Sequence, residues 1–208
     1  MRILSIDTSS YLLSVALADD NHIVACKTIY MERGQGETLA VLIQQLFQTA
    51  QWDFNSLNQV LVAVGPGSFT GVRIGLSAAR GLGLALNVPV TGISNFNAVL
   101  PLSLNQNVCV ALDTKRGDCF VQSFDVSRCP CDSPLVLPVE KVVALNLPIV
   151  TDKPALFDGH DVSLIDMPTC PASHMIDVFL TCQDSALPPE PLYLREADVT
   201  LPSTKHVK

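Results

Sequence analysis

Gly65-Pro66-Gly67-Ser68-Phe69-Thr70-Gly71-Val72-Arg73-Ile74-Gly75 joins an apolar run to an amphipathic stretch, and it is the most specific segment of the chain. The run before it, Gln59–Val64, predicts a buried strand, and the stretch after it, Thr70–Asn87, predicts a helix. Glycines between a strand and a helix allow the backbone to turn sharply or to approach another group closely. Ser68 or Thr70 can cap the helix, whose free N–H groups suit an anion.

This glycine-rich segment matches neither of the common phosphate-binding loops. No Gly-Lys-Ser/Thr follows it, and its third glycine comes one residue too late for Gly-x-Gly-x-x-Gly. The spacing alone leaves two interpretations open, a structural turn with close helix packing and a contact with phosphate or nucleotide. Asp7-Thr8-Ser9-Ser10, after the first predicted strand, leaves a similar choice between an Asx-type turn and a metal–phosphate site.

The residues around the segment predict an α/β order in the first half of the chain. Three strands come first, at Arg2–Asp7, Leu12–Ala18 and His22–Tyr30, with turn residues between the second and the third. Apolar residues then recur with a helical period over Thr38–Gln51. With a final strand at Val88–Ile93, the order becomes ββ-β-α-β-α-β, which is typical of α/β folds.

The second half differs in composition, so we expect a boundary near residue 100 and two subdomains, 1–100 and a smaller, proline-rich 101–208. Of the 11 glycines and 14 prolines, nine glycines lie in residues 1–100 and twelve prolines lie in residues 101–208. The elements predicted in this half are a hairpin of Asn107–Asp113 and Asp118–Val126, short helices at Val139–Leu145 and Ala172–Cys182, and an extended segment at Leu192–Arg195.

Composition and charge exclude several classes of protein. The chain has 208 residues, of which 48% are hydrophobic and 16% charged, so it can form a core and does not resemble a disordered protein. It shows no apolar run of about 18 residues that predicts a membrane span, and the early Asp7 does not suit a secretory signal. Seven cysteines without a Cys-x-x-Cys pair indicate free thiols, and we expect a cytoplasmic protein. A net charge of −7 without a basic cluster argues against tight binding of nucleic acid by this chain alone.

The two predicted helices of the first half carry few charges. Residues 38–52 contain no charged side chain, and residues 70–87 contain only Arg73 and Arg80, which share a helical face and either bind an anion or pair with carboxylates. Exposed helices normally carry Lys and Glu, and interface cores are depleted of charge. We therefore expect a partner chain to cover both helices, with burial under this chain's own second domain as the alternative. The predicted partner contacts are Val41, Gln44, Gln45 and Gln48 on the first helix and Gly71, Gly75, Ala78 and Leu82 on the second.

Motifs for metal binding or nucleophilic catalysis are missing from the sequence. The four histidines are scattered and form neither His-x-x-x-His nor His-Glu-x-x-His, and no Gly-x-Ser-x-Gly elbow occurs. Asp158-Gly159-His160-Asp161 is more typical of a polar turn than of a metal site. We expect neither a metal site nor a catalytic residue in this chain.

Several segments together resemble the TsaB (YeaZ) family. They are Ile3-Leu4-Ser5-Ile6-Asp7-Thr8-Ser9, residues 65–75 and Pro191-Leu192-Tyr193-Leu194-Arg195, and Asp113-Thr114-Lys115-Arg116-Gly117-Asp118 is similar to a further element of the family. The resemblance implies an α/β, actin-like ATPase (ASKHA) fold of two RNase-H-like subdomains, each a mixed sheet flanked by helices. The chain departs from the family at Gln35-Gly36-Glu37, where the family usually has a His followed by a small residue and Glu.

The same resemblance implies a function, that of a non-catalytic subunit in forming N6-threonylcarbamoyladenosine at position 37 of tRNAs that read ANN codons. It implies pairing through a helical interface with the catalytic paralogue TsaD, which carries a metal-binding His-x-x-x-His, and association with the ATPase TsaE. The complex rather than this chain alone would contact tRNA and hold ATP or ADP, and a homodimer of the isolated chain is left open. The residues implied as remnants of a nucleotide cleft are Asp7, Thr8, Ser9, Gly65, Gly67, Ser68, Thr70 and Arg73.

Two other functions compete with this one. A small-molecule kinase or ATPase of the same fold requires nucleotide bound at Asp7–Ser10 and a catalytic carboxylate, for which Asp113 is the candidate. A peptidase, a label that the wider family has carried, would need metal ligands or a catalytic triad that the sequence does not show.

Overall fold

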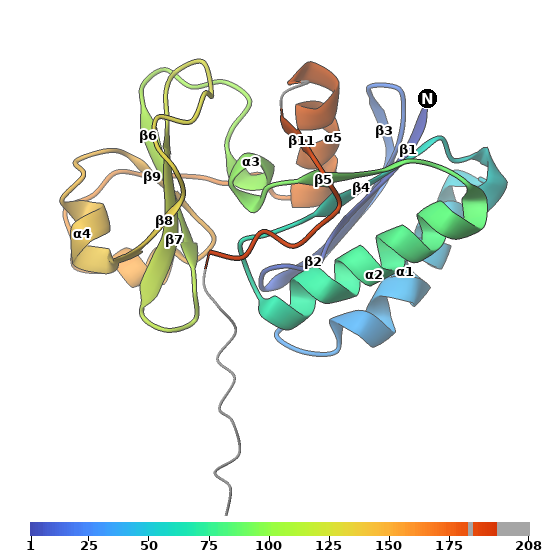
Figure 1. The fold of residues 1–208 in the computed structure, drawn as a ribbon, viewed down its shortest axis with the longest axis horizontal. Coiled ribbons are helices and arrows are strands. Elements are labelled where there is room, and N and C mark those ends of the chain that lie inside the picture. Colours follow the sequence, from blue (N-terminus) through green and yellow to red (C-terminus); the bar gives the residue numbers. More distant parts are fainter. Residues whose placement is uncertain (183–184, 195–208) are drawn as a thin grey trace, which may run out of the picture.

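The chain folds into two β-sheets that lie next to each other, with helices packed around them (Figure 1). This arrangement is seen in a computed structural model, which describes residues 1–182 and 185–194. The first sheet has the strand order β11-β5-β4-β1-β2-β3, and the second has the order β10-β9-β6-β7-β8. The strands of the first sheet are β1 (Arg2–Asp7), β2 (Leu12–Asp19), β3 (His22–Tyr30), β4 (Gln59–Ala63), β5 (Val90–Ile93) and β11 (Ala186–Leu187). Those of the second are β6 (Val108–Asp113), β7 (Asp118–Phe124), β8 (Leu135–Pro138), β9 (Ile149–Thr151) and β10 (Leu164–Ile165).

Both sheets repeat one topology. In the first, β1, β2 and β3 form an antiparallel meander, β4 pairs parallel to β1, and β5 pairs parallel to β4. In the second, β6, β7 and β8 form the meander, β9 pairs parallel to β6, and β10 pairs parallel to β9. A duplicated mixed sheet of this order is the arrangement expected of two RNase-H-like subdomains. The predicted actin-like α/β fold is therefore confirmed.

The helices divide between the two faces of the first sheet and the space beside the second (Figure 1). α1 (Gln35–Ala50) and α2 (Phe69–Leu86) cover one face of the first sheet, and α5 (Pro171–Thr181) covers the other. α3 (Asn95–Val99) lies between the two sheets, where it contacts both α5 and β6. The remaining helical elements are α4 (Val139–Val143) and the 3-10 turns η1 (Phe54–Ser56) and η2 (Pro154–Phe157).

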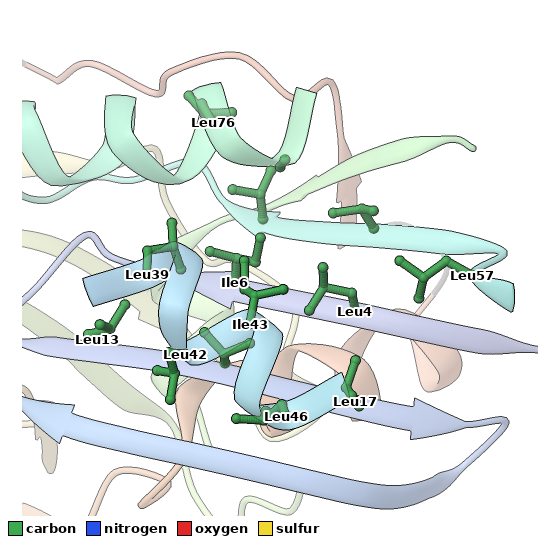
Figure 2. Close-up of a cluster of buried hydrophobic side chains, with 14 of the residues drawn as sticks. Leu4, Ile6, Leu13, Leu17, Leu39, Leu42, Ile43, Leu46, Leu57 and Leu76 are labelled. Carbon is green, nitrogen blue, oxygen red and sulfur yellow. The ribbon is translucent and has the colours of Figure 1, made fainter. Parts of the chain in front are cut away.

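Side-chain alternation along the strands supplies two separate cores to the first sheet. Leu4 and Ile6 of β1 pack beneath α1 and α2, against residues such as Leu42 (Figure 2). Ile3 points to the opposite face and packs with Met175 of α5. Each such fully buried aliphatic side chain contributes about 1.5–3 kcal/mol relative to an exposed one. Because strand side chains alternate, a one-residue slip of β1 would exchange the two cores.

The starts of α1 and α2 follow from local sequence. The Ser68 hydroxyl accepts the N–H of Gly71 at 3.2 Å and so caps α2, as the sequence suggested. Gly34 adopts a φ of 83°, a conformation that favours glycine, directly before α1. α1 therefore begins at Gln35, earlier than the predicted Thr38.

All the elements predicted in the first half are present, with their ends shifted by a few residues. The predicted hairpin is confirmed as β6 and β7, and the two predicted helices of the second half are confirmed as α4 and α5. α3 and the strands β8 to β11 were not predicted; they are two to five residues long. Segments this short contain too few residues to show a helical or strand period. In the extended segment, Leu192 donates its N–H to the Val64 carbonyl at 2.8 Å, and Arg195 lies outside the described residues.

The division of the chain near residue 100 stays a prediction. The structure adds that α5 and β11 follow this point in the chain but pack on the first sheet, where β11 pairs antiparallel with β5. In the part of the chain that the structure describes, no helix has the length and apolar character needed to cross a membrane.

Candidate functional site

The end of β1 forms the floor of a cleft between the two sheets. Asp7 is buried there, and its Oδ1 accepts the N–H of Ser9 at 2.8 Å, which is an Asx-type turn. Burial raises the pKa of Asp7, while the hydrogen bonds from Ser9 oppose that shift. Gln35, the first residue of α1, donates from Nε2 to the Ser10 carbonyl at 3.0 Å and fixes the next part of the turn.

The glycine-rich loop closes directly over this turn. Ser68 donates its N–H to the Ser9 carbonyl at 2.7 Å, and a Cβ placed on Gly67 would lie 2.5 Å from the same oxygen. Asn95 of α3 joins the two segments, because its Nδ2 reaches both the Ser9 hydroxyl and the Pro66 carbonyl. Glycine at position 67 is therefore needed for close backbone packing, which favours the structural interpretation of this loop.

Little space remains at the bottom of the cleft. The free volume lined by Asp7, Ser9, Gly67 and Asp113 is about 20 Å³. A cavity of this size holds about one water molecule. This innermost space is too small for a phosphate group, whereas the adjoining pocket lined by Gly67, Ser68 and Asp113 has a volume of about 440 Å³.

Two further carboxylates reach the cleft from the second sheet. Asp113, at the end of β6, donates its backbone N–H to Oδ1 of Asp152 at 2.9 Å. Removal from water raises the pKa of Asp152 to about 6, and the charges of Asp113 and Asp7 add to this effect. Oδ2 of Asp113 accepts a hydrogen bond of 2.8 Å from the Tyr11 hydroxyl, and its Oδ1 accepts the N–H of Lys115 at 2.7 Å. The carboxylate of Asp113 is thus already bound by groups of this chain.

Tyr11 lies between the two sheets, with the ammonium groups of two lysines over its ring. The ammonium groups of Lys115 and Lys153 lie 4.2 Å and 4.7 Å from the centre of its ring, in cation–π contact. Partial removal from water and the hydrogen bond to Asp113 raise the pKa of Tyr11. Among the described residues, no group of three or more His, Cys, Asp or Glu side chains is arranged to hold a metal ion.

The residues predicted for the cleft lie at different places in the structure. Asp7, Ser9, Gly67 and Ser68 line it, and Gly65 lies in the loop above it. Thr8 instead donates its hydroxyl to the Gly71 carbonyl at 2.6 Å and ties β1 to α2. Thr70 lines a pocket of about 440 Å³ at the mouth of the cleft, together with Gly67, Ser68 and Asp113. Thr70 and Arg73 also line a different depression, on the outer side of α2.

This second depression, here called the α1–α2 groove, has a volume of about 820 Å³. It runs between the two helices of the first sheet, and apolar side chains make up most of its lining. The groove residues are Gly36, Leu39, Ala40 and Ile43 of α1, Phe54 of η1, and Phe69, Thr70, Arg73, Ile74, Ser77, Ala78, Gly81 and Leu82 of α2. An apolar groove of this size on the outside of a chain indicates a surface that another group covers.

The predicted partner contacts fall into three sets. Ala78 and Leu82 line the groove, and Val41, Gln44, Gln45 and Gln48 lie on the exposed side of α1. Gly71 and Gly75 are different, because they are buried on the inner side of α2. A Cβ on Gly71 would lie 2.1 Å from the Thr8 carbonyl oxygen, and one on Gly75 would lie 2.7 Å from the Thr8 hydroxyl. These two glycines allow α2 to pack on β1, so their assignment to a partner surface is corrected.

The two arginines of α2 hold the segment that follows β11. The Arg73 guanidinium lies 3.6 Å from the centre of the Phe69 ring, and its Nε donates to the Tyr193 hydroxyl at 2.9 Å. Nε of Arg80 donates to the Pro189 carbonyl at 2.9 Å. Their contacts in the structure are therefore with this segment and a neighbouring ring, rather than with an anion or a carboxylate.

Sequence reasoning missed Tyr11, Asn95 and Asp152 as cleft residues. Asp152 could have been found from its position. It directly follows the apolar strand β9, just as Asp7 and Asp113 are the last residues of the apolar strands β1 and β6. Asn95 follows Ser94, a typical helix cap, but nothing local indicates that its amide bridges two distant loops.

Comparison with known proteins identifies the family. Residues 30–150 match the family model described as TsaD, tRNA N6-adenosine threonylcarbamoyltransferase. Two curated relatives bear the name tRNA threonylcarbamoyladenosine biosynthesis protein TsaB. The one from Bacillus subtilis strain 168 is 28% identical over 79% of this chain and 73% of its own length. The one from Escherichia coli K12 is 32% identical over 58% of this chain and 53%, or about half, of its own length.

Solved structures agree on the fold. YeaZ from Pseudomonas aeruginosa superposes with a TM-score of 0.76 at 20% identity, over 93% of this chain and 99% of that one. A second structure from that organism, described as an uncharacterized protein with similarity to peptidase YEAZ, gives a TM-score of 0.74 at the same identity and coverage. The chain therefore belongs to the TsaD, or tRNA N6-adenosine threonylcarbamoyltransferase, family, and within it is similar to the TsaB (YeaZ) proteins.

Proposed function

We propose that this chain is a non-catalytic subunit of the assembly that forms N6-threonylcarbamoyladenosine at position 37 of tRNAs that read ANN codons. The observation that carries the proposal is the α1–α2 groove, an outward apolar surface between two helices that carry few charges. A catalytic TsaD-type chain is its proposed occupant. The names of the TsaB relatives support a place in this biosynthesis.

The state of the cleft supports the non-catalytic part of the proposal. About 20 Å³ of free volume lies beside Asp7. Tyr11 and the Lys115 N–H already occupy both oxygens of Asp113, the candidate catalytic carboxylate. A kinase or ATPase needs such a carboxylate free to act on nucleotide or water.

The net charge of the chain bears on its relation to tRNA. With a net charge of −7, the chain is poorly suited to hold tRNA by itself, so we assign tRNA contact to the complex. We likewise assign ATP or ADP, and association with a TsaE-type ATPase, to the assembled complex rather than to this chain alone.

Light scattering after gel filtration tests the pairing. The chain is mixed at micromolar concentration with the paralogue from the same organism that carries His-x-x-x-His, and a one-to-one complex is expected. Ser77→Glu places a charge on the exposed side of the groove and should weaken pairing by about 100-fold, because an unpaired charge is then buried. Leu145→Glu is the matched control on an exposed leucine after α4, and it should pair normally.

Two results would contradict the proposal. Separate peaks for the two wild-type chains would remove the pairing. Equal pairing by Ser77→Glu and the wild type would remove the groove as its site.

A small-molecule kinase or ATPase remains the second candidate, because Asp7, Asp113 and Asp152 line one cleft. ATP turnover by the purified chain that disappears in Asp113→Ala would favour it. Turnover that persists in this variant would point to a contaminant.

A further inference from the structure

Two cysteines that are distant in sequence meet on the α5 side of the first sheet. Cys26 lies on the edge strand β3, opposite Ala16 of β2, and its neighbour on the same face, Thr28, lies opposite Ser14. Cys170 directly precedes α5 on this face. The Ser14 hydroxyl that touches the Cys170 sulfur also touches the Thr28 hydroxyl, so Cys170 lies over the part of β3 that carries Cys26. The two thiols also interact electrostatically. Cys26 is exposed and Cys170 is partly exposed, so solutes can reach the pair.

Ser14 holds the Cys170 thiol in place. Its Oγ lies 3.3 Å from Sγ of Cys170 and 3.2 Å from the Thr28 hydroxyl. The same Oγ accepts the N–H of Ala172 in the first turn of α5, at 3.2 Å. The sulfur of Cys170 therefore sits among hydroxyl groups beside a helix N-terminus, an environment that favours a thiolate.

The two thiols differ in acidity. Burial tends to raise the pKa of Cys170, but hydrogen bonds from Ser14, Thr28 and Ser173 outweigh it and lower the pKa. Partial burial and the neighbouring Cys170 raise the pKa of Cys26. Burial also raises the pKa of Cys109 and of Cys119 to about 12. Cys170 is thus suited to attack an oxidant, and Cys26 is suited to attack the oxidised Cys170 sulfur afterwards.

We propose that Cys170 and Cys26 form a reversible disulfide when the chain meets a peroxide. The Cys170 thiolate attacks one peroxide oxygen, the O–O bond breaks, and a sulfenic acid and hydroxide form. The Cys26 sulfur then attacks the Cys170 sulfur, and the S–O bond breaks with release of water. Overall, two thiols and one hydrogen peroxide give one disulfide and two waters.

The disulfide would join the free edge of the first sheet to the start of α5. α5 lies across the first sheet from α1 and α2 (Figure 1), and Cys170 packs in the core on the α5 side, so a partner in the α1–α2 groove would leave the pair accessible. The inference does not depend on the proposed function, and it holds for the isolated chain and for a complex.

Peptide mapping tests the proposal on the full-length chain. The reduced protein is treated with hydrogen peroxide, its remaining thiols are blocked with N-ethylmaleimide, and the digest is analysed by mass spectrometry. We expect a cross-linked peptide pair containing Cys26 and Cys170, a loss of two of the seven free thiols, and full reversal by dithiothreitol.

Single-residue variants distinguish the roles of the two cysteines. Cys26→Ser should abolish the cross-link and leave Cys170 as a sulfenic acid that dimedone traps, and Cys170→Ser should abolish both products. Ser14→Ala should slow cross-linking about fivefold, the effect of one hydrogen bond to a thiolate. Cys129→Ser, an exposed cysteine away from the pair, should react like the wild type. The proposal is overturned if Cys26 and Cys170 keep their thiols under peroxide, or if Cys170 is oxidised without linking to Cys26.

Discussion

The Tyr11 hydroxyl donates a hydrogen bond of 2.8 Å to Oδ2 of Asp113, and this bond joins the loop after β1 to the end of β6. It links the two halves of the molecule across the cleft that Asp7, Asp113 and Asp152 line. The side chains of this chain therefore join the two sheets directly at this point. The contribution of this hydrogen bond to stability is open to direct measurement.

Tyr11→Phe removes the hydroxyl and keeps the ring under the two lysines. We expect a loss of about 1–3 kcal/mol in the free energy of unfolding, because the buried carboxylate of Asp113 loses a hydrogen bond. Urea denaturation measures the change. Tyr30→Phe is the control, because this exposed ring stacks on Tyr11 at 6.1 Å and should stay in place, with a change below about 0.5 kcal/mol. Equal stability of the two variants would show that the interlobe bond contributes nothing.

Two glycines of α2 should respond in opposite directions to alanine. Gly71→Ala places a methyl group 2.1 Å from the Thr8 carbonyl and should destabilise the fold by about 1–3 kcal/mol. Gly81→Ala has no neighbour within 4 Å and should stabilise it by about 1 kcal/mol, the difference in helix propensity. Guanidinium denaturation of both variants checks this, and a shift of the same sign in both would contradict the packing of α2 on β1.

Gly75 also faces Thr8, so Gly75→Glu should disturb the fold and would not report on partner binding alone.

Asp152 should make stability depend on pH. Its pKa is raised to about 6 in the folded chain from an ordinary value of 3.8, so between these values the folded state binds more protons than the unfolded state. Stability should therefore fall as pH rises from about 4 to about 6, by about 2 kcal/mol after allowance for its partial exposure. Asp152→Asn keeps an oxygen for the Asp113 N–H and should flatten this part of the curve. An unchanged pH dependence in the variant would assign the effect to another group.

Asn95→Ala should loosen the loop above the cleft. The Asn95 amide bonds the Pro66 carbonyl at 2.8 Å and the Gly65 N–H at 3.1 Å, and its loss leaves buried polar groups without partners. We expect a cost of about 2–4 kcal/mol and faster hydrogen exchange of the amides at residues 65–68. Asn97→Ala, in the same helix, should leave exchange in this loop unchanged. Equal exchange in both variants would show that Asn95 does not hold the loop.

Much of this molecule could be predicted from local sequence, for a physical reason. The long strands and helices of the first half bury whole faces, so apolar residues repeat with periods that a single chain displays. The low charge of α1 and α2 is also a local property; these helices border the groove, and their coverage by a partner stays a prediction. Of the second sheet only β6 and β7 were visible in the sequence, so the duplicated sheet order was expected from the family resemblance rather than from the strands themselves.

Other features were decided only by tertiary structure. The strands β9, β10 and β11 are two or three residues long and exist because a neighbouring strand pairs with them. The rotation of α2 about its axis turns Gly71 and Gly75 toward Thr8, although their composition alone suggested an outer surface. Packing between distant segments places Asp7, Asp113 and Asp152 around one cleft. It also brings Cys26 and Cys170 to the same side of the first sheet. Periodicity records which face of an element is buried, and only the folded chain determines what that face meets.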